Sequence, residues 1–116
     1  MKYIEMEKEQ GWIEMKGYID NINGKQIEII SFKIIRLEDN IKLDLLFNCN
    51  GNRYATEFLN VSDICIENMN YPIQIEGFEI VSNESKGWET QFKYTVRDYE
   101  YDTFKFYCEN YSISII

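Results

Sequence analysis

Carboxylates stand at alternate positions in the segment Asp98-Tyr99-Glu100-Tyr101-Asp102, a spacing that calcium-binding loops also use. The segment lacks the glycine and the terminal glutamate of an EF-hand, and acidic residues are common at the tips of hairpins. We therefore interpret it as a solvated turn, and we expect neither a metal ion nor another cofactor in this protein.

The residues that most often perform catalysis are missing. Histidine is absent, which removes the commonest general base near neutral pH and the commonest zinc ligand. No nucleophile-elbow, P-loop or C-x-x-C spacing occurs. Cys49, Cys65 and Cys108 are odd in number and widely spaced, so we expect free, mostly buried thiols in a reducing compartment. The sequence thus predicts a protein that is not an enzyme and has no catalytic residue.

Four tyrosines near the C-terminus stand among Asp, Glu and Asn residues. By strand alternation, they are expected to face away from the apolar side of their hairpin. Tyrosine beside acidic groups is typical of a protein-binding surface. The alternative is that these rings cover the second face of the sheet or pack under the loop 82–87. The candidate partner-binding residues are Tyr99, Glu100, Tyr101, Asp102, Tyr107, Glu109 and Tyr111.

The charge of the chain restricts its partners. A formal net charge of -8 and a pI near 4.5 argue against nucleic acid, because phosphate contacts need clustered Lys and Arg. An acidic surface suits a basic protein partner, or it serves solubility alone. No segment is apolar and long enough for a signal peptide or a membrane span, so we expect a cytoplasmic protein.

The acidic tyrosine segment is expected at the tip of an antiparallel hairpin. Residues 92–96 and 104–108 each alternate apolar with polar side chains, which is typical of half-buried strands. A three-residue loop, 100–102, keeps both apolar sets on one face and puts Asp102 in the left-handed conformation. The predicted pairs are Val96 with Phe106, Tyr94 with Cys108 and, on the solvent side, Lys93 with Glu109.

Two Asn-Gly pairs, at 23–24 and 50–51, are strong signals for two-residue hairpin turns. The first follows an alternating segment, 12–19, which we predict to be a strand. The second follows the clearest core strand of the chain, 41–49. The predicted pairs are Gly17 with Ile30, Met15 with Phe32 and Ile13 with Ile34 across the first turn, and Phe47 with Tyr54, Leu45 with Thr56 and Leu43 with Phe58 across the second.

Residues 27–35 carry two competing apolar sets, and the flanking turns decide between them. A two-residue loop at 39–40 preserves the parity that the turn at 23–24 sets, so one apolar face continues through the hairpins. We therefore expect Ile30, Phe32 and Ile34 in the core in place of Ile27, Ile29 and Ile35. The loop at 39–40 pairs Ile34 with Leu45 and Phe32 with Phe47.

These patterns predict a single all-β domain over residues 1–116. Its strands form an antiparallel meander that makes a two-sheet sandwich or a flattened barrel, two forms that the sequence does not distinguish. The alternating tail, 112–116, is expected to be a closing strand. Trp88 is expected to anchor the core or its rim.

Five short stretches together resemble small bacterial β-proteins of the immunity type, over roughly residues 25 to 115. They are Phe58-Leu59-Asn60-Val61, Gly77-Phe78-Glu79-Ile80, Gly87-Trp88-Glu89, Asp98-Tyr99-Glu100 and Phe106-Tyr107-Cys108-Glu109. The resemblance implies a protein that binds and neutralises a toxin. It supplies no catalytic residues.

Three functional interpretations follow. The first is a non-enzymatic protein-binding module, an immunity-like inhibitor of a bacterial toxin with a basic domain. The second is a β-barrel that holds a small apolar ligand, which would require a closed cavity lined by Phe and Ile. The third is an enzyme that uses carboxylates, which would require two buried acids in one cleft.

Overall fold

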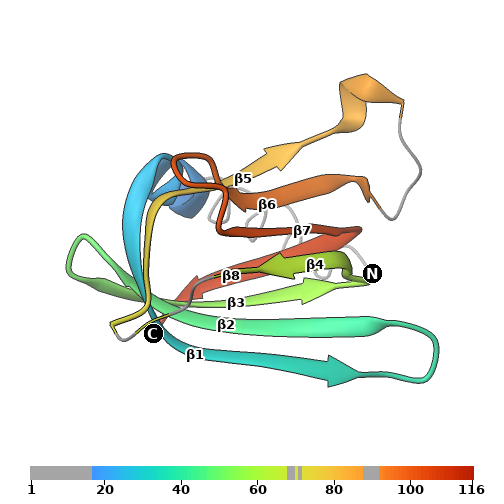
Figure 1. Ribbon diagram of the computed structural model, residues 1–116, viewed down its shortest axis with the longest axis horizontal. Coiled ribbons are helices and arrows are strands. Elements are labelled where there is room, and N and C mark those ends of the chain that lie inside the picture. Colours follow the sequence, from blue (N-terminus) through green and yellow to red (C-terminus); the bar gives the residue numbers. More distant parts are fainter. Residues whose placement is uncertain (1–16, 68–69, 71, 88–91) are drawn as a thin grey trace, which may run out of the picture.

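Most of the described chain is β-structure, as predicted. The computed structural model describes residues 17–67, 70, 72–87 and 92–116 (Figure 1). Residues 17–22 are helical, and Glu84–Lys86 form a short 3-10 helix, η1. In this part of the chain no helix could span a membrane. The strands are β1 (Lys25–Arg36), β2 (Ile41–Cys49), β3 (Asn52–Leu59), β4 (Ser62–Ile66), β5 (Gln74–Ser82), β6 (Tyr94–Asp98), β7 (Phe104–Cys108) and β8 (Asn110–Ile115).

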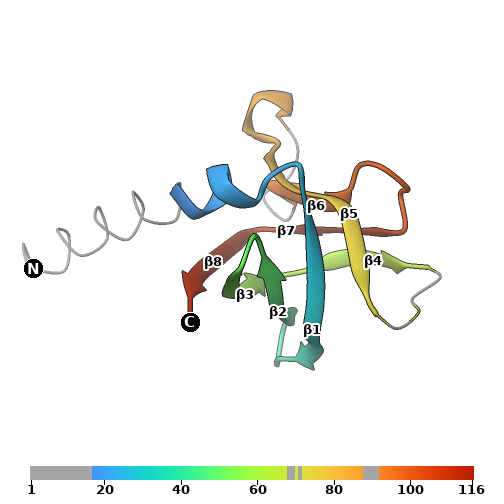
Figure 2. The ribbon, with the colours of Figure 1, turned by 90° about the vertical axis from the view of Figure 1, so that its left-hand side faces the viewer.

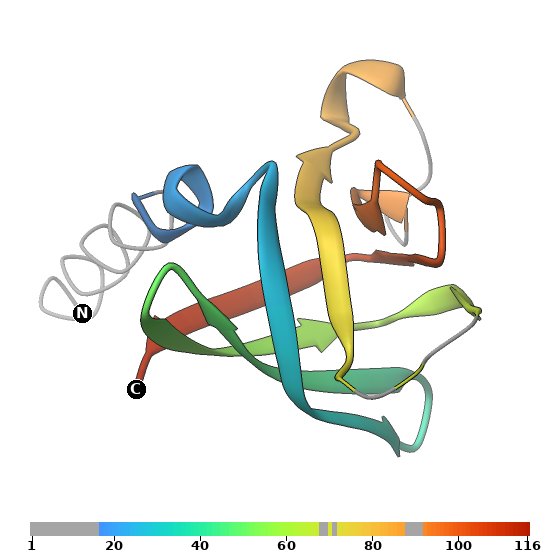
Figure 3. The same cartoon turned by 60° about the vertical axis from the view of Figure 1, so that its left-hand side comes forward.

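All eight strands belong to one antiparallel sheet, in the order β4-β7-β6-β5-β1-β2-β3-β8. The predicted meander is therefore correct only within β1–β2–β3 and β5–β6–β7, because the other neighbours in this order are not consecutive along the chain. The strands at both ends of this order belong to one long two-stranded ribbon, which residues 52–66 and 104–115 form. β3 continues into β4 and β7 into β8, while β3 pairs with β8 and β4 with β7. Figure 3 shows β7 and β8 as one continuous, bent segment that β1 and β5 cross at a steep angle. The sheet therefore curls around its apolar face, although its end strands do not pair with each other among the described residues.

Phenylalanine rings fill the space inside the curl. The Phe47 and Phe78 ring centroids are 5.4 Å apart, those of Phe78 and Phe104 6.5 Å, and those of Phe104 and Phe106 5.5 Å. Phe58 packs edge-on against Phe106 at 4.9 Å. All five rings have zero exposure, so they connect β2, β3, β5 and β7 into one core.

Two predicted hairpins are confirmed. β2 and β3 pair Phe47 with Tyr54 across the turn at 50–51, and the other two predicted pairs are also present. β6 and β7 pair Val96 with Phe106 and Tyr94 with Cys108. In both hairpins a short turn directly joins two alternating segments, so local pattern and turn chemistry suffice to set the register. The predicted closing strand in the tail is β8.

The predicted hairpin at Asn23-Gly24 is wrong. Residues 17–22 are helical and lead directly into β1 at one end of the sheet (Figure 2), while residues 12–16 and Trp88 lie outside the described residues. Asn23 N donates to Ile19 O, and Gly24 has φ 77°, so the pair ends a helix. The Asn23 side chain donates to Ile80 O and accepts from Ile80 N, which fastens the helix end to β5.

The predicted core face of β1 is correct only for Phe32, which packs against the core with its ring centroid 6.4 Å from that of Phe104. Ile27 and Ile29 are buried, whereas Ile30 and Ile34 are 43% and 49% exposed, and Phe32 is half-buried. A register irregularity between residues 29 and 31 reverses the parity of the strand.

The turn between β1 and β2 is also longer than predicted. It spans four residues, 37–40, and not two. As a result, Ile34 pairs with Leu43, and Leu45 pairs with Phe32. The observed partners of Ile34 and Phe32 therefore lie two residues earlier in β2 than the predicted partners.

Candidate partner-binding site

Asp98 organises the hairpin tip, residues 99–102, which contains four of the predicted site residues. Its side chain is buried, with the residue only 2% exposed. Oδ1 accepts hydrogen bonds from the backbone N–H of Gly77 at 3.2 Å and of Glu100 at 3.1 Å, and Oδ2 accepts one from the Thr103 hydroxyl at 3.0 Å. The first residue of the predicted solvated turn is thus a buried structural carboxylate. The predicted left-handed conformation of Asp102 is confirmed, with φ 55°.

Gly77 on β5 allows the tip to lie against the sheet. Tyr99 N donates to Gly77 O at 2.9 Å. A Cβ at position 77 would lie 2.6 Å from Glu100 Cγ and 2.9 Å from Tyr99 Cε1. Sequence reasoning missed this residue, although a glycine inside an alternating strand often marks the close approach of another segment.

The structure divides the predicted site residues into two groups. Tyr99 and Tyr101 are 47% and 66% exposed, and Glu100 and Asp102 are exposed beside them. The remaining three, Tyr107, Glu109 and Tyr111, are half-buried. The tip therefore brings together four of the seven predicted residues on one accessible element.

The half-buried residues make contacts within the protein. The Tyr107 ring packs edge-on against Phe92 with centroids 5.1 Å apart, and Lys105 Nζ lies 5.3 Å from the same ring. Glu109 accepts a hydrogen bond from Asn60 Nδ2 at 2.9 Å. The predicted pair of Glu109 with Lys93 is not among the β6–β7 pairs, and Lys93 Nζ instead lies 3.7 Å from Glu84.

The predicted orientation of Tyr111 away from the core is wrong. Tyr111 pairs with Phe58 on β3, and its ring lies 6.2 Å from that of Phe58 and 4.9 Å from that of Tyr94. Glu109, which lies between β7 and β8, reverses the alternation, so Tyr111 packs against the core. Burial, with smaller effects from Tyr94 and Cys108, raises the pKa of Tyr111 to about 12.

Stability is expected to fall as the pH rises from about 9 to about 12. Burial also raises the pKa of Cys108 to about 12, from an ordinary value of 9.0. Both groups keep their protons in the folded protein, whereas the unfolded chain releases them near their ordinary values, so alkaline pH favours unfolding. Urea denaturation at pH 8 and pH 11 measures the loss. Cys108→Ala should reduce it, and an unchanged loss in that variant would contradict the assignment.

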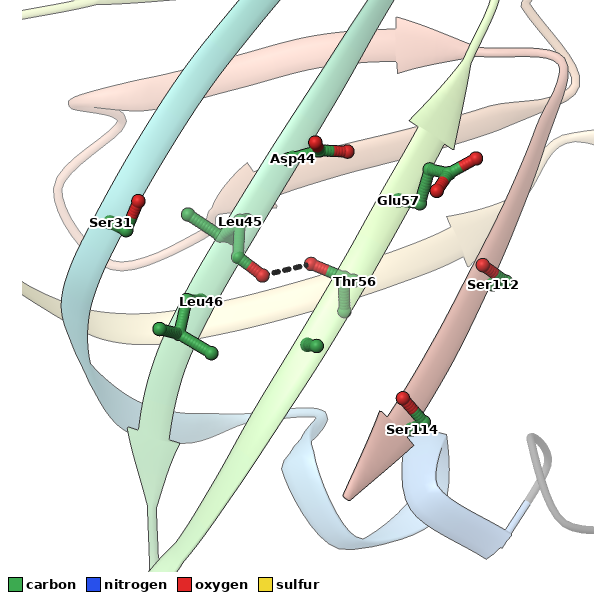
Figure 4. A pocket seen from close by; sticks show the side chains of 9 residues that line it. Ser31, Asp44, Leu45, Leu46, Thr56, Glu57, Ser112 and Ser114 are labelled. Atoms are coloured by element: carbon green, nitrogen blue, oxygen red, sulfur yellow. Dashed lines mark hydrogen bonds between the residues drawn. The ribbon is translucent and has the colours of Figure 1, made fainter. Parts of the chain in front are cut away.

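The surface also carries open hollows. The one in Figure 4 has a volume of about 310 Å³ and lies over β1, β2, β3 and β8. Lys42 Nζ lies 3.6 Å from Asp44 and 3.3 Å from Glu57, both of which line it. A second, of about 250 Å³, adjoins the tip through Thr103. Neither is lined by Phe, and in the second hollow Ile73 and Ile75 stand among Glu67, Gln74 and Glu76, so neither is the closed cavity of Phe and Ile that a site for an apolar ligand would need. No metal-binding group of Cys, Asp and Glu occurs within the described residues.

Together these features define a small acidic antiparallel β-protein whose surface carries an ordered, tyrosine-bearing hairpin tip. The family model of Immunity protein PIM8 matches residues 13–114, and the chain belongs to that family. The resemblance to immunity-type β-proteins seen in the sequence is thereby confirmed. No curated protein and no solved structure matches the chain.

Proposed function

We propose that this protein is a non-enzymatic immunity protein that binds a toxin domain in the cytoplasm and blocks it. The observation that carries the proposal is its membership of an immunity-protein family over residues 13–114. The tip is the proposed contact surface, because it carries Tyr101 and Tyr99, the most exposed aromatic residues in the described part of the chain. Glu100 and Asp102 lie next to them in the sequence. Large aromatic side chains with polar neighbours dominate the binding energy of many protein interfaces.

A basic partner surface suits this contact. The chain carries a net charge of -8, and the charged residues of the tip, Glu100 and Asp102, are both acidic. Complementary charge accelerates association and disfavours wrong partners. We regard the curled sheet as a flattened barrel that supports the tip, since the segments 52–66 and 104–115 take part in both ends of the strand order.

The interior favours this proposal over a ligand-binding barrel. The five buried phenylalanine rings form a continuous series in which the centroids of consecutive rings are 4.9–6.5 Å apart. Rings in contact leave the core occupied by side chains rather than by a ligand.

Co-expression with the product of the neighbouring gene, as the candidate toxin, tests the proposal. The wild type is expected to restore growth and to form a complex whose Kd can be measured by calorimetry. The double variant Glu100→Gln/Tyr101→Ala should raise the Kd about 30- to 100-fold, because loss of an interface tyrosine often costs about 2 kcal/mol or more.

A matched control removes the same kinds of group from another turn. Leu37→Ala/Glu38→Gln takes one exposed large side chain and one carboxylate from the loop between β1 and β2. Its Kd should stay within about threefold of the wild type, as expected for a site outside the interface. Equal affinities of the tip variant and the wild type would show that the tip is not the contact surface. Absence of protection by the wild type would refute the toxin-blocking role.

A further inference from the structure

We infer that Asp98, Thr103 and Gly77 are positioning residues for partner binding: they hold the tip in its binding conformation before the partner arrives. The inference rests on the proposed function. It assigns a role to three residues outside the contact surface.

The Asp98 carboxylate ties three parts of the chain together. Its acceptor atoms take hydrogen bonds from Gly77 on β5, from Glu100 within the tip, and from Thr103 where the chain leaves the tip. Because the carboxylate is buried, water competes weakly for these bonds. The tip is thus attached both to itself and to a neighbouring strand.

Backbone contacts add to this attachment. Asp102 N donates to Asp98 O at 3.1 Å, and Tyr99 N donates to Gly77 O at 2.9 Å. The Tyr99 hydroxyl donates to Gly24 O at 3.5 Å, in the turn just before β1. A loop fixed at both of its ends and along its inner side has little freedom to lose on binding.

Gly77 directs the tip side chains. Tyr99 and Glu100 lie so close to its Cα that any Cβ there would overlap them, at 2.9 and 2.6 Å. Without a side chain at position 77, both residues rest on the backbone of β5. Holding contact side chains in place before association reduces the ordering that binding must otherwise impose.

Thr103 offers the sharpest test, because one atom can be changed with little change in shape. Thr103→Val removes the hydroxyl that donates to Asp98 Oδ2, whereas Thr103→Ser keeps it. With the neighbouring gene product, the candidate toxin, as probe, Thr103→Val is expected to raise the Kd about 5- to 10-fold, and Thr103→Ser to stay within about twofold. Gly77→Ala is a second variant, with an increase at least as large as that of Thr103→Val.

Hydrogen exchange of the free protein gives a reading that does not need the partner. In Thr103→Val the amides of Tyr99 and Glu100 should exchange about tenfold faster, while those of β2 and β3 keep their wild-type rates. A purely structural role would instead lower the thermal midpoint without changing the Kd at 25 °C, where the variant is still folded.

The outcomes separate the two proposals. Faster exchange at the tip with an unchanged Kd would overturn the positioning role, and so would unchanged exchange in Thr103→Val or a Thr103→Ser variant as weak as Thr103→Val. If the wild type itself fails to bind the toxin domain, the proposed function falls, and the positioning role falls with it.

Discussion

Phe78→Ala is expected to lower the free energy of unfolding by about 3–5 kcal/mol, the usual cost of removing a buried phenylalanine ring. The Phe78 ring is fully buried and lies between Phe47 on β2 and Phe104 on β7, at 5.4 and 6.5 Å. Its backbone cannot easily move to fill the space, because Phe78 O accepts a hydrogen bond from Gly24 N. A cavity between three strands should therefore persist.

Urea denaturation at pH 7 measures this loss. A domain of this size is typically stable by about 5–15 kcal/mol, so the variant should be close to the limit of folding. Tyr101→Ala is the control, since Tyr101 is 66% exposed and its loss should change the stability by less than about 0.5 kcal/mol. A loss below about 1.5 kcal/mol for Phe78→Ala would mean that the core is not packed as described.

Asp98→Ala is expected to cost about 2–4 kcal/mol, a large effect for a residue beside an exposed turn. Removing the carboxylate leaves the N–H groups of Gly77 and Glu100 and the Thr103 hydroxyl without their acceptor. Each hydrogen bond to a charged group contributes about 1.5–3 kcal/mol. Water can reach the two partly exposed donors, so the total falls below three times that value.

Asp98→Asn separates the acceptor from the charge. Its single carbonyl oxygen can still accept from the backbone of Gly77 and Glu100, so about half of the loss should be recovered. Asp102→Asn, at a left-handed position that Asn tolerates well, should stay within about 0.5 kcal/mol of the wild type. Equal stabilities of Asp98→Ala and wild type in urea would show that the turn does not depend on this carboxylate.

Sequence patterns predicted best where one short turn joins two alternating strands. The turns at 50–51 and 100–102 have the predicted registers, because the side chains that decide them are neighbours along the chain. The left-handed backbone conformation of Asp102 was predicted from the same local pattern. Local chemistry also identified the four exposed residues of the tip as one continuous surface segment.

Prediction failed where one local signal suits two structures. An Asn-Gly pair favours positive φ, which both a hairpin turn and a helix end can use. Here the side chain of Asn23 bonds to Ile80, 57 residues away, and this contact accompanies the helix end. The irregularity in β1 between residues 29 and 31, and the reversal at Glu109, each exchange the two faces of a strand by a single residue. A pattern of period two carries no warning of such a step.

The all-β class, the acidic character, the lack of histidine chemistry and the exposed tip were therefore determined by the sequence alone, since each depends on residue type or on neighbours along the chain. Only the tertiary structure decided which face of β1 is buried, that Tyr111 packs inside, and that Asp98 and Gly77 hold the tip. Those features arise from contacts between distant segments, such as Gly77 with Asp98. Their free energy depends on how the whole sheet curls, and no local window of the sequence contains that information.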